Sequence, residues 1–191
     1  YSFSSVKNLN KKIKKIAIEF TEGPNDFLTQ EMVNKLLIQN NSALKNQPKS
    51  VIDLQELEYA VLSNPYIESA TVFYTIDGVL KTTVKQRTPI ARVNNVDSSY
   101  YIDKQGFEVP LSDNYSARVI LITGAINKEN LQELTKFVNV ILADDFLKKE
   151  IIGIHKTQDN EFILSVRSGQ YKIEFGFLED TKVKFKKLKA F

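Results

Sequence analysis

The chain of 191 residues contains no cysteine and no tryptophan, and it has a single histidine and a single methionine. Without cysteine it can form no disulfide, no thiolate zinc site and no cysteine nucleophile. Both reducing and oxidising compartments tolerate a protein without thiols, so this absence does not decide where the protein resides. The one histidine, His155, cannot make a metal site or a Ser-His-Asp set by itself.

Long apolar stretches are also missing. No window approaches the roughly 18 consecutive apolar residues of a membrane-spanning helix, and the first residues lack the apolar core of a signal peptide. We therefore expect that any membrane anchor lies outside this sequence. The hydrophobic content of 42% and the charged content of 26% are nevertheless those of an ordinary folded protein.

Motifs for catalysis or cofactor binding are absent as well. The seven glycines form neither a G-x-G-x-x-G phrase nor a P-loop, and no aspartate-rich segment has calcium-loop spacing. Asp144 and Asp145 are adjacent, so on a helix their carboxylates point in different directions, and a solvated helix end explains both. We expect no catalytic residue, no cofactor, no metal and no small-molecule substrate.

Positive charge is concentrated at the two ends of the chain. The net charge is +3, and the clustered lysines are Lys7, Lys11, Lys12, Lys14 and Lys15 at the start and Lys182, Lys184, Lys186, Lys187 and Lys189 at the end. Such runs are consistent with solvated charge, with contact to anionic lipid headgroups, or with nucleic acid binding. Nucleic acid is the least favoured, because a binding face usually interleaves basic and aromatic residues.

The first ninety residues predict a small α+β domain. Residues 13–20 alternate as a half-buried strand, and Thr29 and Asp53 are suited to cap two amphipathic helices. The second helix ends at Asn64-Pro65. Residues 70–76 and 80–84 then alternate on either side of Asp77-Gly78, a strong hairpin signal. The predicted order is β-α-α-β-β.

The second half predicts a β-rich domain with one long helix. Strands are expected at residues 100–102, 107–109, 119–122, 151–156, 161–167 and 170–175, and a helix at residues 127–144, capped by Asn127. Residues 181–191 predict the start of an amphipathic helix. A polar joint is expected over residues 92–97, where the two domains would meet.

Several phrases, in order, resemble those of the FtsQ/DivIB cell division proteins. They are Leu62-Ser63-Asn64-Pro65-Tyr66-Ile67, Gln86-Arg87-Thr88-Pro89-Ile90-Ala91, Ile102-Asp103-Lys104-Gln105-Gly106, and Gly169 followed by Ile173, Phe175 and Gly176. Gln86 stands where the family usually has glutamate, and Tyr66 where tryptophan is frequent. The lysine content and residues 115–118 resemble the Bacteroidetes branch.

The resemblance implies a POTRA domain over residues 13–92, preceded by a basic membrane-proximal segment (1–12) and followed by a β-domain (93–191). It also implies a single transmembrane helix before Tyr1 in the cytoplasmic membrane, with this region on the periplasmic side. The implied partners are other division proteins, notably coiled-coil proteins of the FtsB and FtsL type. In the family, the main partner-binding strand follows the helix that residues 181–191 would begin.

A three-stranded sheet must leave edge strands, and an exposed edge can accept a partner strand. In the POTRA arrangement, residues 69–76 would be one such edge. The candidate partner-binding residues are therefore Ala70, Val72, Phe73 and Tyr74, with Phe73 either exposed or packed under a loop of its own domain. The candidate membrane-proximal residues are Lys11, Lys12, Lys14 and Lys15.

Two other functions compete with a division scaffold. A POTRA-bearing assembly factor for outer-membrane proteins usually repeats the domain, and no second β-α-α-β-β pattern is found here. An enzyme would need a set of reactive residues, which the sequence does not offer.

Overall fold

The computed structural model describes residues 12–21, 23–39, 44, 48, 51–96 and 98–190. The chain divides into two compact units, Tyr1–Arg87 and Thr88–Phe191. Each unit has its own sheet. Of the basic segment expected over residues 1–12, only Lys12 is among the described residues.

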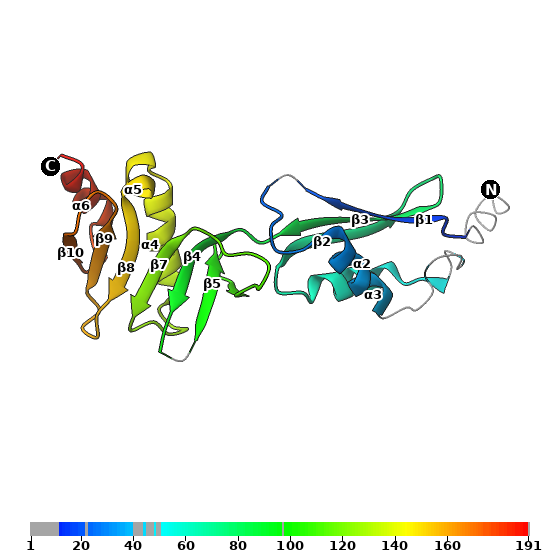
Figure 1. Cartoon of the computed structure of the whole chain (residues 1–191), viewed down its shortest axis with the longest axis horizontal. Helices are drawn as coiled ribbons and strands as arrows, with labels where there is room; N and C mark the ends of the chain where they lie inside the picture. The colour runs from blue at the N-terminus through cyan, green and yellow to red at the C-terminus, as the bar shows by residue number, and fades with distance from the viewer. Residues whose placement is uncertain are drawn as a thin grey trace. The chain divides into compact units, whose positions relative to one another are not determined.

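The first unit has the order β-α-α-β-β that the sequence predicts. Its elements are β1 (Lys15–Phe20), α2 (Gln30–Gln39), α3 (Leu54–Leu62), β2 (Ile67–Tyr74) and β3 (Val79–Gln86) (Figure 1). The strands form a sheet in the order β1-β3-β2, in which β3 is parallel to β1 and antiparallel to β2. The α+β class and the POTRA arrangement are thus confirmed for this unit.

Both helices of the first unit begin at the residues expected to cap them. The Thr29 hydroxyl accepts a hydrogen bond from the backbone N–H of Met32 (3.3 Å). Asp53 Oδ1 accepts from the N–H groups of Gln55 (2.9 Å) and Glu56 (3.2 Å). These bonds satisfy N–H groups that have no partner within a helix. The fully buried apolar side chains of the helices and of β3 are Val33, Leu37, Leu57, Val61, Leu80 and Val84.

The hairpin between β2 and β3 turns at Asp77-Gly78, as expected. The backbone N–H of Thr75 donates to the carbonyl of Val79 (2.9 Å), and that of Gly78 donates to the carbonyl of Thr75 (3.2 Å). Gly78 has a φ of +90°, which residues with a side chain rarely adopt. The glycine therefore fixes the register of the hairpin.

The second unit is rich in strands. Its elements are β4 (Pro89–Asn94), β5 (Ser99–Asp103), β6 (Glu108–Pro110), β7 (Ile120–Gly124), α4 (Leu131–Leu142), α5 (Asp145–Glu150), β8 (Ile151–Lys156), β9 (Phe162–Val166), β10 (Lys172–Gly176) and α6 (Thr181–Leu188). They form a seven-stranded sheet in the order β10-β9-β8-β7-β4-β5-β6. The pairs β4–β7 and β7–β8 are parallel, and the other pairs are antiparallel.

Aromatic side chains fill the core of the second unit beneath α4. The ring of Phe137 lies 5.5 Å from Phe162, 5.1 Å from Phe175 and 5.7 Å from Phe185, measured between ring centres. Phe185 belongs to α6, the helix expected to begin within residues 181–191. Aromatic rings at these separations contribute about 0.5–1.5 kcal/mol a pair beyond the area that they bury. The last helix is thus part of the core.

The hairpin between β5 and β6 explains the Ile102-Asp103-x-x-Gly106 phrase. Asp103 is buried, and its Oδ1 accepts from the N–H groups of Gln105 and Phe107, both at 2.9 Å. Gly106 has a φ of +86°, and a Cβ atom there would lie 2.6 Å from Gln132 Nε2. The aspartate thus stabilises the turn through its carboxylate, and the glycine supplies the left-handed backbone conformation.

Strand β4 includes part of the segment that the sequence predicts to be a polar joint. The sequence predicts a polar joint over residues 92–97, but Arg92 to Asn94 form the second half of β4, inside the sheet. Ala91 and Val93 are fully buried, and β4 pairs with β5 on one side and with β7 on the other. The division into units accordingly falls before Thr88, ahead of the boundary expected after residue 92.

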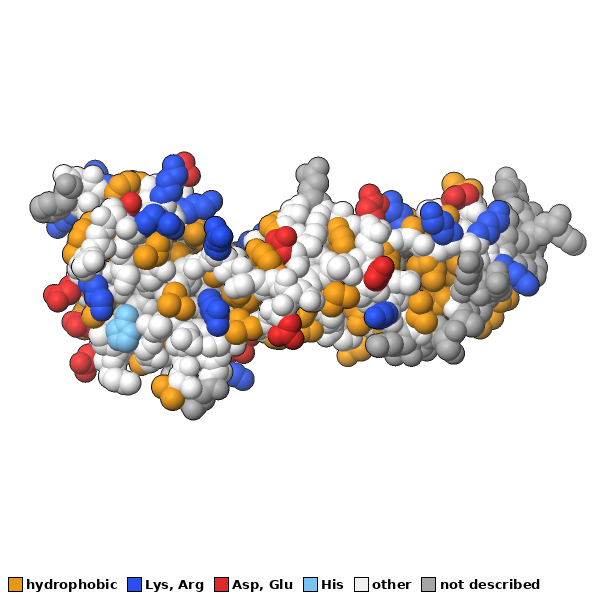
Figure 2. Space-filling view, in the orientation of Figure 1, with side chains coloured by type: hydrophobic (Ala, Val, Ile, Leu, Met, Phe, Trp, Pro, Cys, Tyr) orange, Lys and Arg blue, Asp and Glu red, His pale blue; other side chains and the backbone are white. Residues whose placement is uncertain are grey.

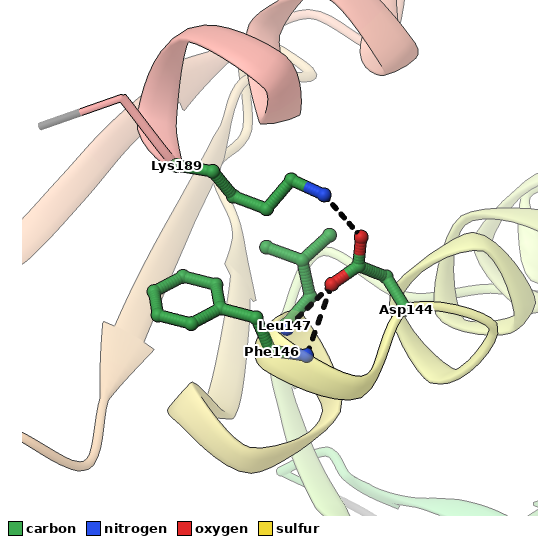
Figure 3. A network of polar contacts seen from close by, with 4 residues as sticks. All are labelled: Asp144, Phe146, Leu147 and Lys189. Carbon is green, nitrogen blue, oxygen red and sulfur yellow. Dashed lines mark hydrogen bonds and ion pairs between the residues drawn. The ribbon is translucent and has the colours of Figure 1, made fainter.

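The long helix expected over residues 127–144 is two helices. The first, α4, starts only at Leu131, after Asn127 and Asn130 exchange side-chain to backbone hydrogen bonds of 3.0 Å. The second, α5, begins after Asp144, whose Oδ1 accepts from the N–H groups of Phe146 (3.0 Å) and Leu147 (3.1 Å) (Figure 3). The aspartate pair therefore marks the start of a new helix.

Candidate protein-binding edge

Strand β2 lies at one edge of the three-stranded sheet, and among the described strands it pairs with β3 alone. An edge strand presents one row of backbone N–H and C=O groups that its own sheet does not use. Such a row can pair with an extended segment of another protein. The expected edge strand over residues 69–76 corresponds to β2, which ends at Tyr74, so that residues 75 and 76 belong to the following turn.

The side chains of the four candidate residues do not lie together. Ala70 is 9% exposed and Val72 is 5% exposed, so both belong to the core and offer a partner only their backbone. Phe73 is 37% exposed and lies opposite Lys81 of β3, on the other face of the sheet. Tyr74 is half-buried, and burial raises the pKa of its hydroxyl above the ordinary value. Phe73 is the only one of the four whose side chain is exposed.

Hydrogen-bond directions identify the backbone groups that face outward. In an antiparallel strand the N–H and C=O of one residue point to the same side, and this side alternates along the strand. The N–H of Thr75 points toward β3, and the N–H of Val72 points away from it. By this alternation the backbone groups of Ala70, Val72 and Tyr74 face the edge.

Glu58, a residue that no sequence pattern singles out, lies against the centre of this edge. Its Oε2 accepts a hydrogen bond from the N–H of Val72 at 3.1 Å. Glu58 is half-buried on α3, the helix that lies against β2 (Figure 1). A partner strand would need the same N–H group for its own ladder. Glu58 therefore competes with strand addition at the centre of β2.

Gln86, at the end of β3, supports the adjoining loop. Its side chain is 2% exposed, and its Oε1 accepts from the N–H groups of Phe27 (3.0 Å) and Leu28 (2.9 Å). Its Nε2 donates to the carbonyl of Leu28 (2.7 Å). Since glutamate could not donate when ionised, the amide matches this set of partners where the family usually has an acid.

Three of the four candidate membrane-proximal lysines are described, and Lys11 lies outside the described residues. Lys12, Lys14 and Lys15 are all exposed. The N–H of Lys14 donates to the carbonyl of Gly78 (3.0 Å), so this segment lies beside the β2–β3 turn. Ile76, in that turn, is 94% exposed. Positive charge and an exposed apolar side chain thus occur at the same end of the sheet.

His155 and Asp144, which are also titratable, both make contacts within the second unit. His155 is exposed on β8, and its Nδ1 lies 3.0 Å from the hydroxyl of Thr123. Asp144 Oδ2 lies 2.5 Å from Lys189 Nζ of α6, and this contact, together with the N–H groups that it accepts from, lowers the pKa of the carboxyl (Figure 3). Asp144 therefore caps α5 and joins it to α6.

Two further findings concern only the part of the chain that the structure describes. Within it, no three His, Asp or Glu side chains are grouped so that they could hold a metal ion. Within the same residues, no helix has both the length and the apolarity needed to cross a bilayer.

Comparison with known proteins supplies two domain matches. Residues 88–191 match the family described as FtsQ/DivIB, C-terminal related, and residues 8–85 match the POTRA-like domain. No curated protein matches the chain.

Two solved structures show low similarity. One is the major extracytoplasmic domain of the trans isomer of the bacterial cell division protein DivIB from Geobacillus stearothermophilus, with 16% identity and a TM-score of 0.36 over 46% of this chain and 76% of that chain. The other is POTRA1-2 of the periplasmic domain of Omp85 from Anabaena, with 14% identity and a TM-score of 0.31 over 84% and 96%.

The match over residues 88–191 covers more than half of the chain, and it agrees with the family phrases found in the sequence. The β-α-α-β-β unit that precedes it is the one matched as POTRA-like. The chain belongs to the FtsQ/DivIB, C-terminal related family and carries a POTRA-like domain in front of the region that defines the family.

Proposed function

We propose that this protein is a non-catalytic scaffold of the bacterial division machinery, which gathers other division proteins at the septum outside the cytoplasmic membrane. The observation that carries the proposal is the family match over residues 88–191. A fold alone would not suffice, because one fold can carry many functions. The exposed edge strand β2 of the POTRA-like unit supports a particular way of binding a partner.

The binding mode is the addition of a partner strand to β2. The backbone groups of Ala70, Val72 and Tyr74 face the edge, and the exposed ring of Phe73 offers an apolar contact on the other face. Main-chain hydrogen bonds would supply affinity, and contacts to side chains such as Phe73 would supply specificity. Partner binding requires that the Glu58 carboxylate leave the N–H of Val72.

The end of β2 that leads into the β2–β3 turn is suited to the membrane surface. Lys12, Lys14 and Lys15 are exposed beside the turn that carries Ile76. Each lysine near an anionic bilayer is worth about 1 kcal/mol, and a small apolar side chain can enter the headgroup region. We place this end, with Lys11, near the membrane, after a transmembrane helix that precedes this sequence. The region described here then lies on the periplasmic side.

The partners that the family implies are coiled-coil division proteins of the FtsB and FtsL type. A role in outer-membrane protein assembly is the second candidate. The POTRA-like unit precedes a domain of different topology that matches the FtsQ/DivIB, C-terminal related family, which favours the division scaffold.

The test is depletion of the full-length protein in its own bacterium, followed by microscopy of living cells. A division scaffold predicts long undivided filaments with segregated chromosomes. Cells of normal length with depleted outer-membrane barrels would contradict the proposal and support the assembly role. Cells normal in both respects would contradict both functions.

A further inference from the structure

A hollow opens in the second unit where the strands β4, β7 and β8 begin. It encloses about 500 Å³, a volume typical of ligand pockets. Its lining comprises Thr88, Pro89, Ile90, Arg118, Val119, Ile120, Leu142, Lys148, Ile151, Ile152 and Arg167. The described residues that line the hollow all belong to the second unit, and none of them belongs to the β2 edge.

The charged side chains that line the hollow are positive. Arg118, Lys148 and Arg167 are exposed, and no aspartate or glutamate is among the described residues that line the hollow. Among the residues that the structure describes, neither Arg118 nor Lys148 forms an ion pair. Figure 2 shows Lys and Arg side chains gathered over α5 and the nearby strand ends, with hydrophobic side chains between them. Such a surface attracts an anionic partner.

One of the three cations is held in place by the backbone. The Nε of Arg167 donates to the carbonyl of Lys149 at 2.9 Å, which restricts the orientation of the guanidinium group. The terminal nitrogens have no partner among the described residues. A planar guanidinium group can bind a carboxylate through two parallel hydrogen bonds, and a fixed orientation lowers the entropic cost of that contact.

Two strand irregularities border the same hollow. The register of β4 with β5 shifts between Pro89 and Ala91, and that of β8 with β9 shifts between Ile151 and Gly153. Ile90 and Ile152 therefore have no partner in either neighbouring ladder. Ile152 is 41% exposed. Bulges are frequent beside functional sites because they redirect a side chain and interrupt pairing.

We propose that this hollow binds an acidic, partly aliphatic peptide segment of a partner protein. Glutamate or aspartate side chains of the peptide would contact Arg118, Lys148 and Arg167, and an aliphatic side chain would pack on Ile152. The combination of separate cations with apolar walls is suited to alternating acidic and aliphatic residues. A phosphate group or a nucleic acid backbone would leave the apolar walls unused.

The test uses the full chain and a short fluorescein-labelled peptide of glutamate, leucine and serine, with a matched peptide in which glutamine replaces glutamate. Fluorescence anisotropy gives the affinity of each. The test variant is Arg118→Glu with Arg167→Glu. The control variant, Lys136→Glu with Lys172→Glu, makes the same change in net charge at exposed positions outside the hollow. Thermal unfolding checks that both variants remain folded.

We expect the acidic peptide to bind the wild type and the control variant alike, and the test variant more weakly by on the order of tenfold, because attraction is replaced by repulsion at two contacts. Lys148→Glu and Ile152→Ser should each weaken binding as single variants. Equal weakening in the control variant, or equal affinity of the glutamine peptide, would overturn the proposal. So would binding of phosphatidylglycerol vesicles or nucleic acid through the same residues without binding of the peptide.

Discussion

The Oε2 atom of Glu58 lies 3.1 Å from the backbone nitrogen of Val72, across the gap between α3 and the edge strand β2. The carboxylate occupies the position that the carbonyl of an added strand would take. Natural edge strands are often protected by charged groups against unwanted pairing. In this protein the protecting group is the side chain of Glu58, and the proposed strand addition requires that it leave the N–H of Val72.

Replacing Glu58 by alanine should expose the centre of the edge. We expect the amide hydrogen of Val72 to exchange faster with solvent, and the free energy of unfolding to fall by about 1 kcal/mol, because one hydrogen bond to a carboxylate is lost. Affinity for a strand-adding partner should rise. Hydrogen exchange followed by NMR measures the first effect, and denaturant unfolding the second.

Glu56→Ala is the matched control for that experiment. Glu56 is exposed on the same helix, and among the described residues its carboxylate forms no hydrogen bond or ion pair. Unchanged exchange at Val72 in Glu58→Ala, or the same increase in Glu56→Ala, would show that the carboxylate does not protect the edge.

Gln86→Glu should destabilise the first unit. The carbonyl of Leu28 would lose its donor and face a buried carboxylate, which costs about 1–3 kcal/mol. Because a protonated carboxyl can donate, the loss should diminish as the pH falls and the new acid takes up a proton. Urea unfolding at several pH values checks this, with the exposed Gln55→Glu as control. A loss that did not change with pH would contradict this account of the site.

Asp144 should make the second unit sensitive to acid. Its pKa lies below the ordinary value of 3.8, first because it bonds to Lys189 and then because it accepts from backbone N–H groups. A carboxyl with a lowered pKa in the folded state stabilises the protein above its unfolded-state pKa, and this contribution is lost as the pH falls through the folded-state value. Asp144→Asn should therefore lower the unfolding temperature at neutral pH, and the difference from wild type should vanish in strong acid.

Asp145→Asn is the control for the acid experiment. Asp145 opens α5, and no hydrogen bond of its carboxylate is recorded among the described residues. A difference between Asp144→Asn and wild type that persisted in strong acid would contradict a role for the ionised carboxylate of Asp144.

Local signals in the sequence explain why most elements could be predicted. Asp53 and Thr29 cap helices through bonds to residues two or three positions ahead, and Asp77-Gly78 closes a hairpin between adjacent strands. These interactions depend on short segments, so their residue types are visible in the chain. The phrase at Asp103 and Gly106 is local in the same way.

Features that depend on distant residues were not visible. The sequence predicts a polar joint over part of β4, because the place of this strand in the sheet depends on β7, which lies far along the chain. The cap of α5 by Asp144 is local, through the N–H groups of Phe146 and Leu147, but the sequence also fits an aspartate pair at the end of the preceding helix, and it does not decide between the two. Nothing in the sequence around Glu58 indicates its contact with Val72, because that contact depends on how α3 packs against β2.

The central claim is that the β2 edge binds a division partner, and Val72→Pro tests it most directly. Proline removes the outward N–H but leaves the β2–β3 ladder, because the N–H of Val72 does not point toward β3. Val72→Ala, which loses side-chain volume and keeps the N–H, is the control. Thermal unfolding checks that both variants of the full-length protein are folded.

The measurement is cell length in a strain depleted of the wild-type protein and complemented with each variant. The account predicts that Val72→Pro leaves the cells as filaments and fails to capture division proteins in cross-linking, whereas Val72→Ala restores division. Normal division with a folded Val72→Pro protein would contradict strand addition at β2 as the binding mode.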